Sequence, residues 1–295
     1  MEKLVYIILI NYNSKVHTIE CLESLSELNY INYRIIIVDN NSIDNDFDKV
    51  KSKYNNVYII NNKKNYGFAG ANNIGIKYAL DNKADYILLL NNDTTVDKDF
   101  LSVLVNESEK NKKVAICTSK ILYYGSKNKI WYGGGGISYF KGNSQIYNLN
   151  CDNDSINNKN MYCNFASGCC MLINSEALKK VGLMNEEYFL YYEDVDYCIK
   201  FLNAGYKIYY VPESIIFHKE SISTKKYSYL YQYYFARNRL LFIKKNFNML
   251  NKITAYPISI LWLLYKILNR TFNFKPCIEG IKDFLIHNYG MKEEG

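Results

Sequence analysis

The sequence predicts an α/β protein built on a doubly wound, mostly parallel sheet and followed by a helical C-terminal region. Two observations predict this fold. In roughly the first hundred residues, short apolar runs alternate with stretches whose apolar residues recur at helical spacing. After residue 225 the chain is basic and its pattern is helical. The repeated strand-helix-strand order favours parallel strands joined by right-handed crossovers.

The first strands are predicted from continuous runs of β-branched and aliphatic residues, the pattern of strands buried on both faces. These runs are 4–10, 33–38, 57–60 and 86–90. The helices between them are predicted at 18–28, 48–54 and 70–80. The rhythm is lost over 116–160, which contains Gly133 to Gly136 and a polar stretch from Asn148.

Regular patterns return in the second half of the chain. A helix is predicted at 194–204, closed by Gly205, and it leads into a strand at 207–211 that Pro212 is expected to end. A further strand is predicted from Ser214 to Phe217. We expect two regions, a sheet domain over 1–224 and a helical region over 225–295.

The composition is that of a folded protein with a sizeable core, 48% hydrophobic and 22% charged. The 36 Lys and Arg residues exceed the 29 Asp and Glu residues by 7, which suits an anionic ligand or an anionic membrane surface. The eight cysteines form no Cys-x-x-Cys pair, and the N-terminus shows no signal-peptide pattern. We therefore expect reduced thiols in a cytoplasmic protein without a zinc site. No nucleic-acid-binding module is recognisable, so no nucleic-acid partner is expected.

Polar side chains follow three of the predicted strands. The strand ends read Asn11-Tyr12-Asn13, Asp39-Asn40-Asn41-Ser42 and Asn91-Asn92-Asp93-Thr94. In an open parallel sheet, ligands bind beyond the carboxyl ends of the strands. Each group alone is explained by turn formation and helix capping. Because all three meet at one edge of the sheet, the functional interpretation is favoured.

Three further features carry chemistry. The loop from Asn65 to Asn73 has small residues before a helix and could present backbone N–H groups to an anion, although its spacing is not that of a dinucleotide-binding loop. Asp93 beside Asn92 suits a hard divalent cation that bridges phosphate oxygens. Asp194 opens a helix and is either a first-turn charge or a general base, and His218 could complete the coordination of the ion on Asp93.

Together these motifs resemble an inverting family-two glycosyltransferase of the GT-A fold, closest to the rhamnosyltransferase-like branch. The matching segments occur in the order of that family and span roughly the first four-fifths of the chain. They are 8–13, 38–42, 65–75, 88–94, 166–168, 191–196, 205–218 and 236–239. The resemblance implies that residues 1–224 form a nucleotide-sugar transferase domain and that this domain includes the segment on the acceptor side of the site.

The resemblance implies a role for each of nine residues. Asn11, Asn13, Asp39 and Asn73 would contact the nucleotide, with Asp39 at the base or ribose, and Asn92 would join this donor-binding set. Asp93 would bind the donor through Mg²⁺ or Mn²⁺, with His218 as a second ligand of the metal. Arg237 would cover the diphosphate when a loop closes. Asp194 would be the catalytic base.

The sequence departs from the family pattern in two places. Asn91 and Asn92 stand where many relatives carry a carboxylate, so metal binding depends more heavily on Asp93. Met184-Asn185-Glu186-Glu187 replaces the commoner Phe-Asp-Glu sequence before the acidic motif, which leaves the acceptor open. The implied reaction is a single in-line displacement by an acceptor hydroxyl that Asp194 deprotonates.

The partners expected are a dTDP- or UDP-sugar as donor and a glycan or lipid-linked molecule as acceptor. Residues 253–268 are largely apolar, but the run is interrupted by Pro257 and is shorter than the roughly 20 residues that cross a bilayer. It is either a core or subunit-interface helix or a helix that lies on a membrane, anchored by Trp262, Tyr265 and basic residues. The oligomeric state is left open.

Two other functions fit the sequence less well, namely nucleotidyl transfer and the binding of a sugar nucleotide without catalysis. A nucleotidyltransferase would carry a glycine-rich basic loop directly after the first strand, whereas residues 11–15 contain no glycine. A sugar-nucleotide-binding module without activity would not need both Asp93 and Asp194.

Overall fold

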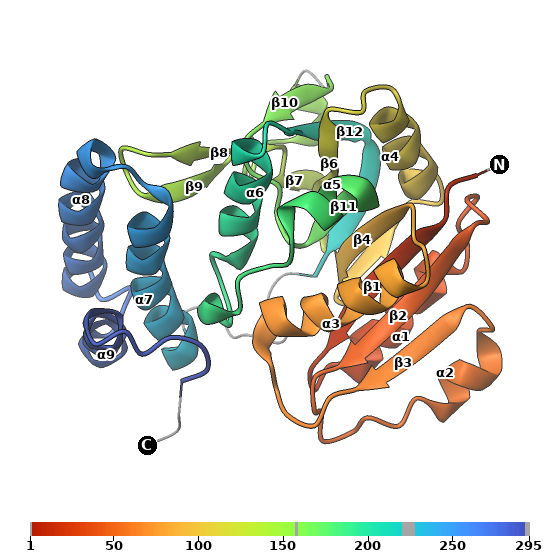
Figure 1. The fold of residues 1–295 in the computed structure, drawn as a ribbon, viewed down its shortest axis with the longest axis horizontal. Helices are drawn as coiled ribbons and strands as arrows, with labels where there is room; N and C mark the ends of the chain where they lie inside the picture. The colour runs from red at the N-terminus through yellow and green to blue at the C-terminus, as the bar shows by residue number, and fades with distance from the viewer. Residues whose placement is uncertain (1, 157–158, 220–227, 293–295) are drawn as a thin grey trace.

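The computed structural model describes residues 2–156, 159–219 and 228–292. Figure 1 shows a twisted sheet flanked by helices, with three helices at the end of the molecule opposite the N-terminus. The predicted boundary between 224 and 225 lies outside the described residues.

Strands and helices alternate through the first hundred residues, as predicted. The strands are β1 (Val5–Asn11), β2 (Tyr33–Asp39), β3 (Val57–Asn61), β4 (Tyr86–Asn91) and β5 (Thr94–Val96). The helices are α1 (Lys15–Leu25), α2 (Asp48–Lys53), α3 (Gly67–Asp81) and α4 (Phe100–Glu109). Helix α1 therefore begins and ends three residues earlier than its pattern predicted.

Residues 114–174, which include the segment without an alternating pattern, form mostly short strands. They are β6 (Val114–Tyr123), β7 (Ser126–Tyr132), β8 (Gly135–Ser138), β9 (Asn143–Ile146), β10 (Met161–Cys163) and β11 (Cys170–Asn174). A short 3-10 helix, η1 (Asn153–Ser155), lies between β9 and β10. The chain continues through α5 (Ser175–Val181), η2 (Glu186–Tyr188), α6 (Glu193–Asn203) and β12 (Lys207–His218), and then α7 (Tyr229–Asn246), α8 (Met249–Leu268) and α9 (Phe274–Leu285).

Among the described residues, one sheet runs in the order β10-β12-β6-β11-β4-β1-β2-β3, with β5 beside β12 and β7 beside β6. Strands β1 to β4 are parallel, and they contribute the predicted doubly wound unit. Strand β11 enters antiparallel between β4 and β6. The sheet is thus mixed, and strands β8 and β9 form a separate hairpin.

Pro212 does not end a strand. Strand β12 runs through it as a single element of 12 residues that pairs with β6 on both sides of the proline. The pairing register shifts between Val211 and Ile215, so an irregularity absorbs the residue that cannot donate a ladder hydrogen bond. This continuous strand carries His218 to the edge where β5 begins, because His218 pairs with Thr94.

The core of the sheet is apolar, as the sequence pattern requires. Strands β1, β2 and β4 are buried along almost their whole length, with α3 packed on the face of β1 and β2 that is turned toward the viewer in Figure 1. All eight cysteines are free thiols, and only Cys151 is exposed. Burial raises the pKa of the Cys21 thiol to about 12, which keeps it protonated and inert.

Candidate active site

The ends of β1 and β2 are joined by side-chain hydrogen bonds. The Asn11 amide donates to Oδ1 of Asp39 at 2.7 Å and to Oγ of Ser42 at 3.0 Å. The backbone N–H of Ser42 donates to Oδ2 of Asp39 at 2.9 Å. Asn11 and Asp39 are fully buried. Their first role in the structure is therefore to hold the turn that follows β2.

Asn13 lies exposed at the surface of this network. Its backbone adopts a left-handed conformation with φ 51°, which asparagine tolerates better than most residues. Its N–H donates to Oγ of Ser42 at 2.9 Å, and its side-chain oxygen accepts from the N–H of Ile43 at 2.9 Å. Ser42 thus ties the two turns together.

The network extends to the end of β4. The Thr18 hydroxyl donates to Oδ1 of Asn11 at 2.9 Å and accepts from the Asn92 amide at 2.8 Å. A continuous chain of hydrogen bonds therefore runs from Asp39 through Asn11 and Thr18 to Asn92, beside Asp93. The predicted meeting of three strand ends at one edge is present in the structure.

Asp93 and His218 form a buried pair. Nε2 of His218 lies 3.2 Å from Oδ1 of Asp93, and the imidazole packs edge-on against Trp131 with ring centroids 4.6 Å apart. Burial raises the pKa of Asp93, but the hydrogen bond and the charge of His218 outweigh that effect and leave the pKa below its ordinary value. Asp93 is therefore an anion at neutral pH. Nδ1 of His218 is buried without a hydrogen-bond partner among the described residues.

The pair fits a hard divalent cation. Two atoms bound about 2.1 Å from one octahedral ion, at right angles to each other, are about 3 Å apart, close to the separation of Nε2 and Oδ1. Among the described residues, no group of three or more His, Cys, Asp or Glu side chains gathers at one point. An ion held here would thus have two protein ligands and would keep its other positions for water and phosphate oxygens.

Asp194 is fixed at the start of α6. Its Oδ2 accepts from the backbone N–H of Gly168 at 3.0 Å and its Oδ1 from the N–H of Val195 at 2.8 Å. Burial raises the pKa of Asp194, and these two N–H groups limit the rise because they stabilise the charged form. Its neighbour Glu193 is more deeply buried, and burial followed by the charge of Asp194 raises the pKa of Glu193 well above its ordinary value.

Asp93 and Asp194 both lie near Cys169. The N–H of Asn91 donates to the carbonyl oxygen of Cys169 at 3.0 Å, next to the Gly168 N–H that binds Asp194. Burial raises the pKa of the Cys169 thiol, and the charges of Asp93 and then Asp194 raise it further. The pairing of β4 with β11 therefore brings the candidate metal ligand and the candidate base to the same edge.

The turn before α6 is strained. Phe189, Tyr191 and Tyr192 have φ of 62°, 68° and 73°, a conformation that bulky residues rarely adopt. The Asn238 amide donates to the carbonyl oxygens of Tyr188, Leu190 and Tyr191 at 2.8–2.9 Å. Helix α7 thereby holds the turn in the conformation that places Asp194.

Comparison with known proteins identifies the family. Residues 6–182 match the family model described as Glycosyl transferase family 2. The chain belongs to this family. The dTDP-rhamnosyl transferase RfbF of Shigella flexneri is 26% identical over 267 residues, which are 83% of this chain and 82% of that protein. The rhamnosyltransferase WbbL of Escherichia coli K12 is 24% identical over 266 residues, 85% of this chain and 99% of that protein.

A solved structure shares the fold. The structure of GalNAc-T7 with UDP, GalNAc and Mn²⁺ superposes with a TM-score of 0.68 at 15% identity, over 97% of this chain and 58% of that one. The expected family, its rhamnosyltransferase-like branch and the GT-A fold are confirmed. The chain is a glycosyltransferase.

In this glycosyltransferase Asn73 lies apart from the strand ends. Its Nδ2 donates to the carbonyl oxygen of Met184 at 3.0 Å and to Oε1 of Glu186 at 2.8 Å, and its Oδ1 accepts from the Met184 N–H at 2.9 Å. The side-chain amide thus pairs with the backbone of the segment that replaces the commoner Phe-Asp-Glu sequence. Its contacts are structural, and the predicted contact with the nucleotide stays a prediction.

Arg237 also has contacts other than those expected. Its guanidinium is fully buried, and each of its five N–H groups has an acceptor. The acceptors are Oδ1 of Asn238, the Tyr233 hydroxyl and the carbonyl oxygens of Glu187, Tyr188 and Gly290, at 2.7–3.4 Å. With no donor left for a diphosphate, Arg237 clamps the segment before α6 to the C-terminal end of the described chain.

Three backbone N–H groups of the loop before α3 donate to protein acceptors, and anion binding by this loop stays a prediction. The N–H groups of Tyr66 and Gly67 donate to the side-chain oxygens of Asn40 and Asn65. The N–H of Phe68 donates to the carbonyl oxygen of Phe189 at 2.7 Å. Gly67 is required here, because a Cβ would lie 2.3 Å from that same oxygen. The loop therefore docks against the strained turn.

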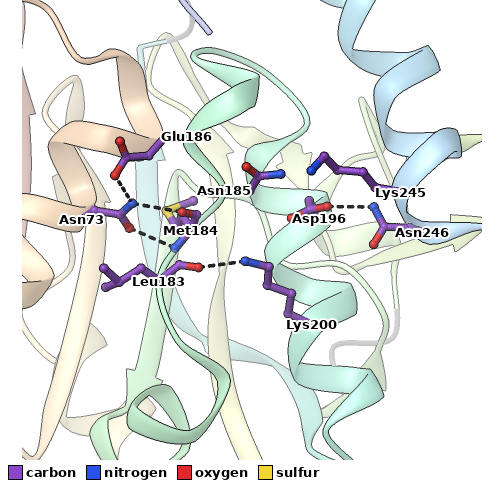
Figure 2. Close-up of a pocket in the computed structure, with 9 residues that line it drawn as sticks. All are labelled: Asn73, Leu183, Met184, Asn185, Glu186, Asp196, Lys200, Lys245 and Asn246. Atoms are coloured by element: carbon purple, nitrogen blue, oxygen red, sulfur yellow. Dashed lines mark hydrogen bonds between the residues drawn. The ribbon is translucent and has the colours of Figure 1, made fainter. Parts of the chain in front are cut away.

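A cavity of about 670 Å³ opens beside α6. Figure 2 shows the residues that line it. Its lining includes Asn73, Lys200, Lys245 and Asn246, but none of the other predicted site residues. Asp196 is buried at its wall, where Oδ1 accepts from the Tyr188 hydroxyl at 2.9 Å and from the Asn246 amide at 2.7 Å. Asp196 lies two residues after Asp194, and these bonds hold α6 to η2 and to α7.

Four residues of the site were not predicted individually. Ser42, Thr18, Gly168 and Asn238 each hold a predicted residue or the turn that positions it. Ser42, Gly168 and Asn238 lie inside motifs that the sequence analysis identified, so their position was a usable signal. Thr18 lies within α1, and no sequence pattern marks it.

Proposed function

We propose that this glycosyltransferase moves rhamnose or another hexose from a nucleotide-diphosphate donor to a hydroxyl group of a glycan or lipid-linked acceptor, in the synthesis of a cell-surface polysaccharide. The observation that carries the proposal is the approach of Asp93 and Asp194 on either side of Cys169, at the edge where the parallel strands end. Because RfbF is a dTDP-rhamnosyl transferase, dTDP-rhamnose is the first donor to test, and UDP-hexoses are second.

The proposed donor site is the hydrogen-bonded edge from Asp39 to Asn92. Each carboxylate oxygen of Asp39 accepts one hydrogen bond from the protein and retains lone pairs for a base or ribose group. Asn13 is exposed beside it, in a conformation fixed by Ser42. Asn11 and Asn92 orient these groups through Thr18.

Asp93 and His218 are the proposed metal ligands, for Mg²⁺ or Mn²⁺. The ion would neutralise negative charge on the leaving diphosphate. The solved structure with GalNAc-T7 contains Mn²⁺, which supports the proposal without fixing the ion for this chain. His218 reaches Asp93 because β12 runs unbroken through Pro212.

Asp194 is the proposed catalytic base. As the acceptor oxygen attacks the anomeric carbon, its proton passes to the carboxylate of Asp194. The new bond joins the acceptor oxygen to the anomeric carbon. The bond between the anomeric carbon and the phosphate oxygen breaks, and its electron pair leaves with the nucleoside diphosphate. One displacement inverts the anomeric centre. The Gly168 N–H fixes the rotamer of Asp194, and burial raises the pKa of its carboxyl, which improves it as a base.

The experiment that tests the proposal measures transfer and donor hydrolysis with dTDP-rhamnose and UDP-hexoses, with Mg²⁺ and with Mn²⁺. The anomeric configuration of the product, read by NMR, should be opposite to that of the donor. Retention of configuration would exclude the single displacement. Release of sugar 1-phosphate instead of a nucleoside diphosphate would mean that the nucleotidyl group is transferred, which would favour a nucleotidyltransferase. Donor binding without turnover would indicate a sugar-nucleotide-binding module without activity.

We further propose that the enzyme acts in the cytoplasm, at the inner face of the cell membrane. Within the described part of the chain, no helix is long and apolar enough to cross a bilayer. The proposal is supported by the basic C-terminal region, residues 225–295.

A further inference from the structure

The outward side of α8 is apolar along its whole length. The exposed residues recur every three or four positions, which places them on one face of the helix. Those that form this stripe are Leu250, Ile253, Pro257, Leu261, Leu264 and Leu268, and Met249 and Tyr265 are exposed on the same helix. Ile253 is 69% exposed and Leu268 is 81% exposed. A stripe of large aliphatic side chains turned to solvent is unusual for a helix on the surface of a globular protein.

This stripe is not the packing face of the helix. Ala255, Ser259 and Leu263 are the buried residues of α8. Ser259 accepts a hydrogen bond from Nε of Arg239 at 2.9 Å, and Trp262 packs between Phe235 and Phe272. Trp262 is therefore half-buried among aromatic rings, whereas Tyr265, the other anchor expected from the sequence, is 62% exposed. Whether either side chain anchors the helix at a membrane stays a prediction.

Helix α8 also runs through Pro257, where the sequence suggested an interruption. It forms a single helix of 20 residues, because tertiary packing on α7 outweighs the loss of one backbone hydrogen bond. The apolar stripe is consequently continuous from Leu250 to Leu268.

Helix α9 adds a mixed apolar and basic face. Phe274, Ile278 and Leu285 are exposed on it, with Lys275 and Lys282 beside them. Figure 1 shows α8 and α9 together at the end of the molecule opposite the N-terminus, both outside α7. We call the exposed residues of these two helices the α8–α9 face.

The charge of this face is positive. Its exposed basic side chains are Lys275 and Lys282 on α9, and the exposed Arg270 follows α8 directly. The acidic residues between 249 and 292 are Glu279 and Asp283. Glu279 is paired with Lys292, and Asp283 accepts a hydrogen bond from the Tyr233 hydroxyl. Among the described residues, none of these three basic side chains forms an ion pair.

We propose that the α8–α9 face binds the surface of a lipid bilayer that contains anionic lipids. Aliphatic side chains of α8 and α9 would enter the boundary between headgroups and acyl chains, while Arg270, Lys275 and Lys282 contact anionic headgroups. A second copy of the chain is a poorer occupant. A two-fold dimer through this face would place these three cations against their own copies, without compensating carboxylates.

The inference names a surface for the membrane contact in the proposed function, but its test is independent of sugar transfer. None of the residues on this face belongs to the proposed donor, metal or base set. Lipid binding can therefore fail while transfer to a water-soluble acceptor persists, and transfer can fail while lipid binding persists.

The experiment is flotation of the full chain with vesicles of phosphatidylcholine alone or mixed with phosphatidylglycerol. We expect flotation with the mixed vesicles and a loss of binding as salt is raised. Leu261→Ser with Leu268→Ser should weaken binding by about tenfold or more, since two aliphatic side chains leave the lipid. Lys275→Gln with Lys282→Gln should weaken binding to the mixed vesicles only.

Matched controls come from exposed residues elsewhere. Ile31→Ser with Leu149→Ser removes two exposed aliphatic side chains, and Lys49→Gln with Lys112→Gln removes two exposed charges. Both control pairs should bind as the wild type does. Absence of wild-type binding, or equal losses in the controls, would overturn the proposal. A dimer in sedimentation that Leu261→Ser with Leu268→Ser dissociates would assign the face to a second copy instead.

Discussion

The backbone N–H of Gly168 donates a hydrogen bond of 3.0 Å to Oδ2 of Asp194. This bond joins the end of the loop before β11 to the start of α6, and it orients the half-buried carboxylate of Asp194. The adjacent Cys169 carbonyl accepts the N–H of Asn91, so the same two residues of the chain position Asp194 and the end of β4.

Asp194→Asn should lower the rate of sugar transfer by about 10²–10⁴, because the amide cannot accept the proton of the acceptor. The side-chain oxygen of the asparagine can still accept from the Gly168 N–H, so the fold and donor affinity should be unchanged. The rate is measured with saturating donor, and donor affinity by calorimetry. Glu193→Gln is the matched control. Since burial already favours a neutral Glu193, this variant should keep most of the activity, and the reverse pattern would move the base to Glu193.

The pH dependence of kcat/KM should show an acid limb above the ordinary range of an aspartate. Burial raises the pKa of Asp194, and the base must be ionised to work. Activity is therefore present above the raised pKa and is lost as the pH falls through it. The limb is measured with Mg²⁺ held saturating at each pH. An acid limb at or below the ordinary aspartate pKa of 3.8 would contradict the burial of this carboxyl.

Arg237→Ala should destabilise the fold by about 3 kcal/mol or more, because it leaves several buried carbonyl oxygens without a hydrogen-bond donor. The expected fall in Tm is about 5–10 °C. Two measurements distinguish a structural role of Arg237, as the clamp seen here, from the contact with the diphosphate that the sequence implies. A clamp lowers Tm in the absence of ligand, whereas a diphosphate contact raises the Kd of the donor and leaves the Tm of the free protein intact. Arg239→Ala is not a suitable control, because Arg239 is buried as well.

The β-α-β rhythm was sufficient to predict β1 to β4 and the edge at which their polar ends meet. This was possible because burial on both faces imposes a local pattern that the sequence displays directly. Pro212 misled the prediction, since an irregularity in pairing, visible only once β6 lies alongside, accommodates it. The local rule for proline was overridden by the sheet.

Side-chain direction was harder to predict than position. Asn73 and Arg237 lie in motifs of the family, yet their partners are 111 and about 50 residues away along the chain. Whether such a side chain faces a ligand or another loop depends on packing that no local pattern encodes. By contrast, Asp93 and His218 lie against each other as shared ligands would, since both follow strands that end at the same edge, and their binding of a metal stays a prediction.

Asn73→Asp should destabilise the protein by about 1–3 kcal/mol, because the donor to the Met184 carbonyl is lost and a carboxylate is placed against Glu186. Chemical denaturation measures this change. Asn82→Asp, at the exposed end of α3, is the matched control and should be near neutral. If Asn73→Asp instead leaves stability unchanged and weakens nucleotide binding alone, the contact inferred from the family is correct and the structural assignment is not.

Removal of divalent ions should abolish transfer, and Mg²⁺ or Mn²⁺ should restore it, if Asp93 and His218 hold the ion that neutralises the leaving diphosphate. Asp93→Asn keeps the size of the side chain but removes its charge. We expect it to raise the concentration of Mn²⁺ needed for half-maximal transfer by about tenfold or more, since hard cations prefer carboxylate ligands. His218→Gln should raise that concentration less. Asp97→Asn, an exposed acid shortly after Asp93, is the matched control and should leave the metal requirement as it is. Full activity in a chelator, or an unchanged Mn²⁺ requirement in Asp93→Asn, would show that the Asp93–His218 pair stabilises the fold and binds no catalytic ion.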